Sequence, residues 1–148
     1  MTKMKIGTGD WIVVCDGRKA LILENLGDRM FPNLHTREVH EHPDPPTSAL
    51  GSSALGKVHQ SMGGARSSIE QTDWHEESER AFLKTLAERL DVAVTTGETT
   101  GLTMVASPRA LGMIRVDYSA AVRKALHGEL HKDLVKMPVH EIEKQLLA

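Results

Sequence analysis

The sequence predicts an α/β fold built on a five-stranded mixed sheet of order 3-2-1-4-5, with helices on both faces of the sheet. Two observations lead to it. Near the start, two short apolar runs are separated by Asp16 and Gly17, which is a strong signal for a hairpin. Further along, apolar runs alternate with segments of helical periodicity, and strands joined through helices return to the same sheet in parallel.

The first three strands are expected over residues 11–15 (WIVVC), 19–24 (KALILE) and 36–40 (TREVH). The first two runs are apolar and short, as buried strands are, whereas the third is more polar. Asp16 and Gly17 tolerate the positive φ angles of tight turns, so the first two strands are expected to pair. Strands joined in this way run antiparallel.

Periodicity then disappears between residues 42 and 72, where prolines, glycines and serines are frequent. A segment of this length without secondary structure is uncommon in a compact domain, and it is usually functional or disordered. We therefore expect an insertion loop over about residues 42–72, within a single domain that spans residues 1–148.

A long helix is expected to begin after this loop. Asp73 and Glu76 have the spacing of a capping box, in which each side chain satisfies a free backbone N–H group of the first turn. Apolar side chains then recur at helical spacing from Trp74 to Val94. The helix is expected to end before Gly97.

The last third of the chain predicts two more strands separated by helices. Residues 102–107 (LTMVAS) form the fourth expected strand, and Pro108 suits the first turn of the helix that follows. Ser119 can cap another short helix. An edge strand is expected over residues 128–135, and Pro138 starts a terminal helix. This succession of strands and helices is the ribonuclease H-like arrangement.

Composition narrows the class of protein. The 148 residues are 40% hydrophobic but only 3% aromatic, so the core depends on aliphatic side chains. The net charge of -2 gives no general attraction for nucleic acid. Cys15 is the single cysteine and lies in an apolar run, which favours a small core residue. No apolar segment reaches the ~20 residues of a membrane span. No signal peptide is visible either, so a cytoplasmic location is expected.

One candidate binding site follows from the predicted sheet. Ligands of open α/β sheets collect at the carboxyl ends of the strands, and helix N-termini there attract anions. Asp16, Gly17 and Arg18 would meet Ser107 and Arg109 at that edge, which suits a phosphate or a carboxylate. In the alternative interpretation Ser107 only caps its helix, Arg109 is solvated and Asp16 is a turn residue.

Other kinds of chemistry have weaker support. The histidines near residues 35–59 match no zinc spacing, so neither a metal nor another cofactor is expected. The sequence has no Gly-x-Ser-x-Gly turn, no phosphate loop and no dinucleotide fingerprint. These observations favour binding over catalysis.

Four segments in order carry a resemblance to a known family: residues 11–24, 61–90, 102–115 and 131–146. On these segments the chain resembles the host attachment proteins, which are grouped with bacterial and archaeal relatives of the class-one release factor. The resemblance implies a ribonuclease H-like domain similar to the middle domain of those factors and of Pelota. It also implies a ribosome or tRNA as partner.

Release factors of that lineage use a Gly-Gly-Gln loop to place the hydrolytic water. Here Gly63 and Gly64 are followed by Ala65, so the resemblance implies association without hydrolysis. The contact would use Gly63 and Gly64, with Lys57 and Arg66 binding phosphates. No DNA partner is expected.

Two alternatives remain open. The first is a nuclease of the ribonuclease H type, in which Asp16 would help to bind Mg²⁺. The second is a homodimer or larger homo-oligomer that serves as a scaffold or regulator and affects attachment to host cells indirectly.

Overall fold

The computed structural model describes the backbone of residues 5–42 and 55–147, and the side chains of residues 5–42 and 75–147. Its elements follow in the order β1 (Trp11–Cys15), β2 (Lys19–Asn25), β3 (Leu34–Glu41), α2 (Leu55–Thr95), β4 (Leu102–Val105), α3 (Pro108–Arg115), α4 (Ala120–Ala125), β5 (Leu126–Leu130) and α5 (Val139–Leu147).

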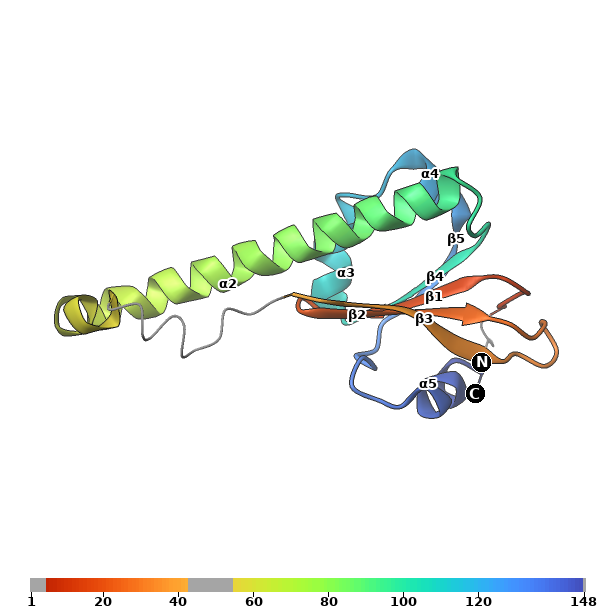
Figure 1. Ribbon diagram of the computed structural model, residues 1–148, viewed down its shortest axis with the longest axis horizontal. Helices are drawn as coiled ribbons and strands as arrows, with labels where there is room; N and C mark the ends of the chain where they lie inside the picture. Colours follow the sequence, from red (N-terminus) through yellow and green to blue (C-terminus); the bar gives the residue numbers. More distant parts are fainter. Residues whose placement is uncertain (1–4, 43–54, 148) are drawn as a thin grey trace.

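The strands form one five-stranded sheet of order β3-β2-β1-β4-β5. β1 pairs antiparallel with β2, and β2 with β3, while β4 lies parallel to both β1 and β5. The predicted fold class, a mixed sheet of order 3-2-1-4-5 with helices on its faces, is confirmed (Figure 1).

Helices cover both faces of the sheet, with α2, α3 and α4 on one side and α5 on the other (Figure 1). The side chains of β1 alternate between the two layers, because successive residues of a strand point to opposite faces. Trp11, Val13 and Cys15 join the core under α2, α3 and α4. Ile12 and Val14 join the core under α5, together with Ile142 and Leu146.

The described part of α2 packs through a stripe of buried side chains: Leu83, Leu86, Ala87, Leu90 and Ala93. Their spacing of three or four residues places them on one face of the helix. α2 ends at Thr95, before Gly97 as expected, and Gly97 then takes a left-handed conformation with φ 83°. Gly97 N donates to Val94 O and Glu98 N to Ala93 O, which is the Schellman arrangement.

The expected start of this helix is wrong. α2 begins at Leu55, so the residues 73–76 that predicted a capping box lie inside the helix. Residues 55–72 of the expected loop are helical, and residues 43–54 lie outside the described part. Lengthening an existing helix needs no new nucleus, so a segment without an apolar stripe can continue one. Each helical glycine costs only about 1 kcal/mol.

The other boundaries differ by a few residues. The fifth strand ends at Leu130 and not at residue 135, and a short turn connects it to α5. Within the described residues, no helix is long and apolar enough to cross a membrane.

Candidate functional site

The carboxyl ends of β1 and β4 lie side by side, as the sequence predicted. Val14 of β1 is paired in register with Val105 of β4. Asp16 and Ser107 therefore follow neighbouring parallel strands at the same edge of the sheet. The two segments of the predicted anion site, residues 16–18 and 107–109, lie at this one edge.

The turn between β1 and β2 is shaped by the carboxylate of Asp16. Its Oδ1 accepts hydrogen bonds from Arg18 N and Lys19 N, both at 2.8 Å. Asp16 N also donates to Lys19 O at 2.9 Å. The predicted hairpin is confirmed, with Gly17 and Arg18 at its centre.

Gly17 is needed for a reason other than the expected one. A tight turn was expected to need a positive φ angle at this glycine, but its φ is not positive. Among the described residues, the glycines with positive φ are Gly9 and Gly97. A Cβ atom on Gly17 would instead lie 2.6 Å from Cγ and 2.9 Å from Cβ of Glu79. The glycine leaves room for a side chain of α2.

Ser107 caps α3. Its backbone is extended, with φ -64° and ψ 158°, and its Oγ accepts a hydrogen bond from Ala110 N at 3.2 Å. Pro108 occupies the first turn, where a missing N–H group costs nothing. The capping interpretation of Ser107 therefore holds.

Arg109, in the same turn, is not simply solvated. Its Nη1 lies 2.6 Å from Oε1 of Glu79, and 59% of its side chain is exposed. Oε1 of Glu79 is buried but has no aligned hydrogen-bond donor among the described residues, so the contact is an ion pair without hydrogen-bond geometry. The Glu79 carboxylate of α2 is thus ion-paired with the Arg109 guanidinium that was expected to attract an external anion.

Glu79 links the two segments and was not predicted from the sequence. It contacts Gly17 on one side and Arg109 on the other. Its position offered a signal, since Glu79 precedes Leu83 by four residues and Leu86 by seven. That spacing puts the carboxylate on the face of α2 that packs on the sheet.

His42 and Asp133 lie near the same edge. His42 N donates to Arg18 O at 2.7 Å, and its ring lies 6.1 Å from that of Phe82 on α2. Burial raises the pKa of the Cys15 thiol to about 12, and the negative charges of Asp16 and Asp133 add to this. The thiol is therefore protonated at neutral pH and is a poor nucleophile.

The remaining predicted contact residues, Lys57, Gly63, Gly64 and Arg66, lie in the helical backbone of α2 and not in a loop. Their side chains lie outside the described residues. Arg66 and Glu79 are separated by 13 positions of one helix, which corresponds to about 20 Å along its axis.

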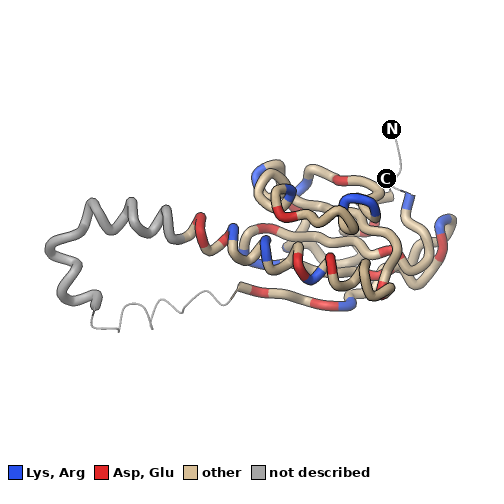
Figure 2. The backbone as a smooth tube through the Cα atoms, turned by 90° about the horizontal axis from the view of Figure 1, so that it is seen from above, with Lys and Arg blue, Asp and Glu red and all other residues tan. Residues whose placement is uncertain are grey.

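Charges of both signs interleave along the described backbone (Figure 2). Attraction for an anion must therefore come from local groups such as Arg109. Among the residues whose side chains are described, no three His, Cys, Asp or Glu groups gather in a way that could hold a metal ion.

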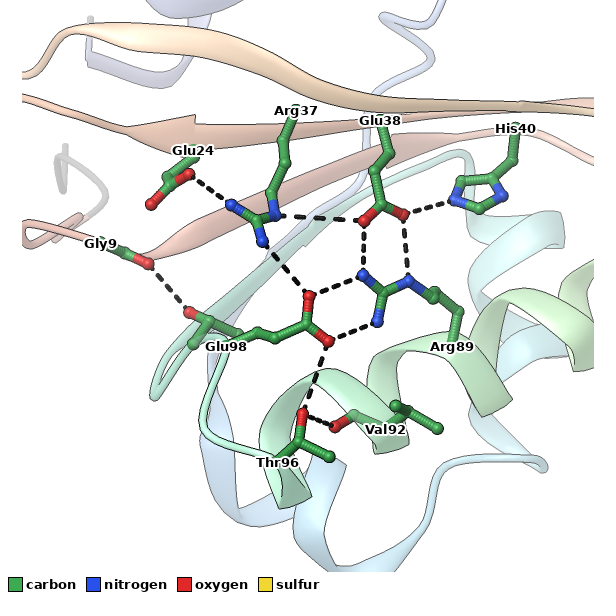
Figure 3. Close-up of polar contacts among 10 residues, drawn as sticks. Gly9, Glu24, Arg37, Glu38, His40, Arg89, Val92, Thr96 and Glu98 are labelled. Atoms are coloured by element: carbon green, nitrogen blue, oxygen red, sulfur yellow. Dashed lines mark hydrogen bonds and ion pairs between the residues drawn. The ribbon is translucent and has the colours of Figure 1, made fainter.

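A second polar cluster lies where α2 ends over β2 and β3 (Figure 3). Arg89 of α2 donates to both carboxylate oxygens of Glu38 and of Glu98. Arg37 of β3 donates to Glu24 at 3.0 Å and to Glu98 at 3.2 Å. These bonds join α2, β2, β3 and the segment after α2 into one network.

Trp11 lies beneath this network and is fully buried. The guanidinium carbons of Arg37 and Arg89 lie 4.9 Å and 5.3 Å from its ring centroid, within the range of cation–π attraction. Hydrogen bonds from Arg89 and Arg37 lower the pKa of Glu98 to about 2, against a partial opposing effect of desolvation. The cluster was not predicted, because its members are far apart in sequence.

A family model described as "Protein required for attachment to host cells" matches residues 11–146. The match runs from the first residue of β1 into α5, so it includes all five strands. No curated protein gives a significant match to the chain.

Proposed function

We propose that this chain is a non-catalytic factor that associates with the ribosome or with tRNA in the cytoplasm. The chain belongs to the family of proteins required for attachment to host cells. The proposal includes a relationship to the release-factor and Pelota middle domain. The observation that carries the proposal is that α2 is one continuous helix. Lys57 and Arg66, the predicted phosphate contacts, lie on the same helix as Glu79. Glu79 in turn contacts Arg109 at the carboxyl edge of the sheet.

The chemistry of the candidate site supports binding rather than turnover. Asp16 uses Oδ1 to hold the β1–β2 turn. The Cys15 thiol has a pKa of about 12. Ala65 follows the glycine pair, at the position where the release factors of the proposed relationship carry the water-directing glutamine.

Arg109 supplies the edge contact in this proposal. Its side chain is more than half exposed, and Glu79 is its one ion-pair partner among the residues whose side chains are described. A phosphate of an RNA backbone can compete for the Arg109 guanidinium. Phosphate contacts release condensed counterions, so the affinity should fall as salt rises. Few contacts are involved, so the slope should be shallow.

Co-sedimentation with purified ribosomes over a salt series tests this function. Lys57→Ala, Arg66→Ala and Arg109→Ala should each weaken binding several-fold and lower the slope of log affinity against log salt by about one. Lys124→Ala, at an exposed lysine of α4, is the matched control and should bind as the wild type does. Binding that none of the three changes affects would contradict the proposal.

Two outcomes would favour the alternatives. Mg²⁺-dependent cleavage of RNA or of an RNA–DNA hybrid, lost in Asp16→Asn, would indicate a nuclease. A stable oligomer that binds neither ribosomes nor tRNA would indicate a scaffold or regulator.

A further inference from the structure

The connection between β2 and β3, residues 26–33, is here called the β2–β3 tip. It lies at one end of the sheet (Figure 1, orange). Three of its side chains are large, apolar and exposed: Leu26 by 57%, Met30 by 80% and Phe31 by 76%. Together they expose a few hundred Å², on the order of the largest apolar patch of a typical monomer.

A fully buried asparagine holds the base of the tip. Asn25 Nδ2 donates to the carbonyl oxygens of Ile6 and Gly7, at 3.2 Å and 3.0 Å. Asn25 Oδ1 accepts from Gly27 N and Asn33 N, both at 2.9 Å. These bonds span both sides of the tip and tie it to the segment before β1.

The tip itself is tightly turned. Asp28 Oδ1 accepts from Met30 N at 2.9 Å and from Phe31 N at 2.7 Å. The backbone passes so close to itself that a Cβ on Gly27 would lie 2.1 Å from Phe31 O. The loop therefore presents Met30 and Phe31 to solvent from a preorganised backbone, which lowers the entropy cost of binding through them.

We propose that the β2–β3 tip is a self-association surface through which two copies of this chain pair about a twofold axis. The charges of the tip indicate this partner. Asp28 and Arg29 are adjacent, exposed and opposite in sign, and Arg29 has no ion-pair partner among the described residues. When the twofold axis passes through the tip, Arg29 of one copy can face Asp28 of the other and the reciprocal pair forms as well, because contacts in an isologous interface occur twice.

The size of the patch sets the strength of the pairing. Stable interfaces bury about 800 Å² on each partner, which is more than the three apolar side chains of the tip supply. The dimer is therefore reversible, with a dissociation constant in the micromolar range or above. This inference is independent of ribosome association, because it uses neither α2 nor Arg109.

Sedimentation velocity of the full chain, from about 10 μM to about 1 mM, measures the pairing. The wild type should shift from monomer to dimer over this range. The double variant Met30→Ser, Phe31→Ser should raise the dissociation constant at least about tenfold, as expected for loss of a hot spot. Arg29→Glu should weaken pairing as well, because like charges would then face each other. Val116→Ser, at a side chain 72% exposed elsewhere, should leave it unchanged.

Disulfide trapping gives a second readout that does not depend on affinity. Cys15 is fully buried and protonated, so an introduced cysteine is the only reactive thiol. Under mild oxidation Asn33→Cys should form a covalent dimer, and Val116→Cys should not. The proposal would be overturned if the chain stays monomeric at the highest concentration. It would also be overturned if the Val116→Cys control and the Asn33→Cys tip variant cross-link equally. Tip-dependent binding to phosphatidylcholine–phosphatidylglycerol vesicles without dimerisation would also overturn it.

Discussion

The side chain of Glu79 lies against the backbone of Gly17, where a Cβ atom would come within 2.9 Å of three of its carbon atoms. One of these is Glu79 Cβ, which cannot move without moving α2. Gly112 in α3 offers the opposite case, since nothing lies within 4 Å of a Cβ built there. The two glycines should therefore respond to the same substitution with opposite signs.

Gly17→Ala should lower the free energy of unfolding by about 1–3 kcal/mol, the usual cost of overpacking. Gly112→Ala should raise it by up to about 1 kcal/mol, because alanine is the better helix former. Urea denaturation measures both. In a double-mutant cycle, Glu79→Ala should recover part of the loss caused by Gly17→Ala. If the effects of Gly17→Ala and Glu79→Ala on the free energy of unfolding simply add, the contact with Glu79 is not the cause of the loss at Gly17.

At the scale of elements, the cluster around Arg89 fixes the end of α2 over β3. Hydrogen bonds from Arg89 lower the pKa of Glu38, and those from Arg89 and Arg37 lower the pKa of Glu98 from 4.5 to about 2. A carboxylate whose pKa falls on folding stabilises the folded state above its unfolded pKa. That contribution is lost as the pH falls through the folded pKa.

The free energy of unfolding should therefore decrease between pH 4.5 and about 2 in the wild type. Glu98→Gln should be less stable than the wild type at pH 6. The two should approach each other as the pH falls through about 2 and converge only below it, where the carboxylate is protonated in both the folded and the unfolded state. Urea denaturation over this pH range gives the two curves. Glu88→Gln, at an exposed position next to Arg89 on the same helix, should follow the wild type. Parallel curves for wild type and Glu98→Gln would contradict this account.

The sequence predicted those elements whose signals are local. The runs around Trp11 and Leu102 are apolar and bounded by turn residues, and Ser107 and Pro108 have strong preferences for a helix start, so these elements were found. The start of α2 was missed because Asp73 and Glu76 satisfy a capping pattern equally well in mid-helix. Glu79 and Arg89 were missed because each acts through partners that only the folded sheet brings near.

At the scale of the whole molecule, β1 belongs to both hydrophobic cores. Trp11, Val13 and Cys15 pack under α2, α3 and α4, while Ile12 and Val14 pack under α5. Neither layer can lose its packing without exposing one face of the central strand. The two cores should therefore unfold in one cooperative transition.

Ile142→Ala tests this coupling. Ile142 is fully buried in the core under α5 and does not belong to the core on the other face of the sheet, which contains Trp11. The change should cost about 2–5 kcal/mol through lost burial and a residual cavity. In a Trp74→Phe background Trp11 is the only tryptophan, so its fluorescence reports the opposite layer. The fluorescence and far-ultraviolet circular dichroism transitions should move together to lower urea by the same amount. Met137→Ser, at a partly exposed side chain just before α5, should shift both by less than about 0.5 kcal/mol. A circular dichroism transition that moves while the Trp11 transition stays in place would show that α5 unfolds independently of the rest of the sheet.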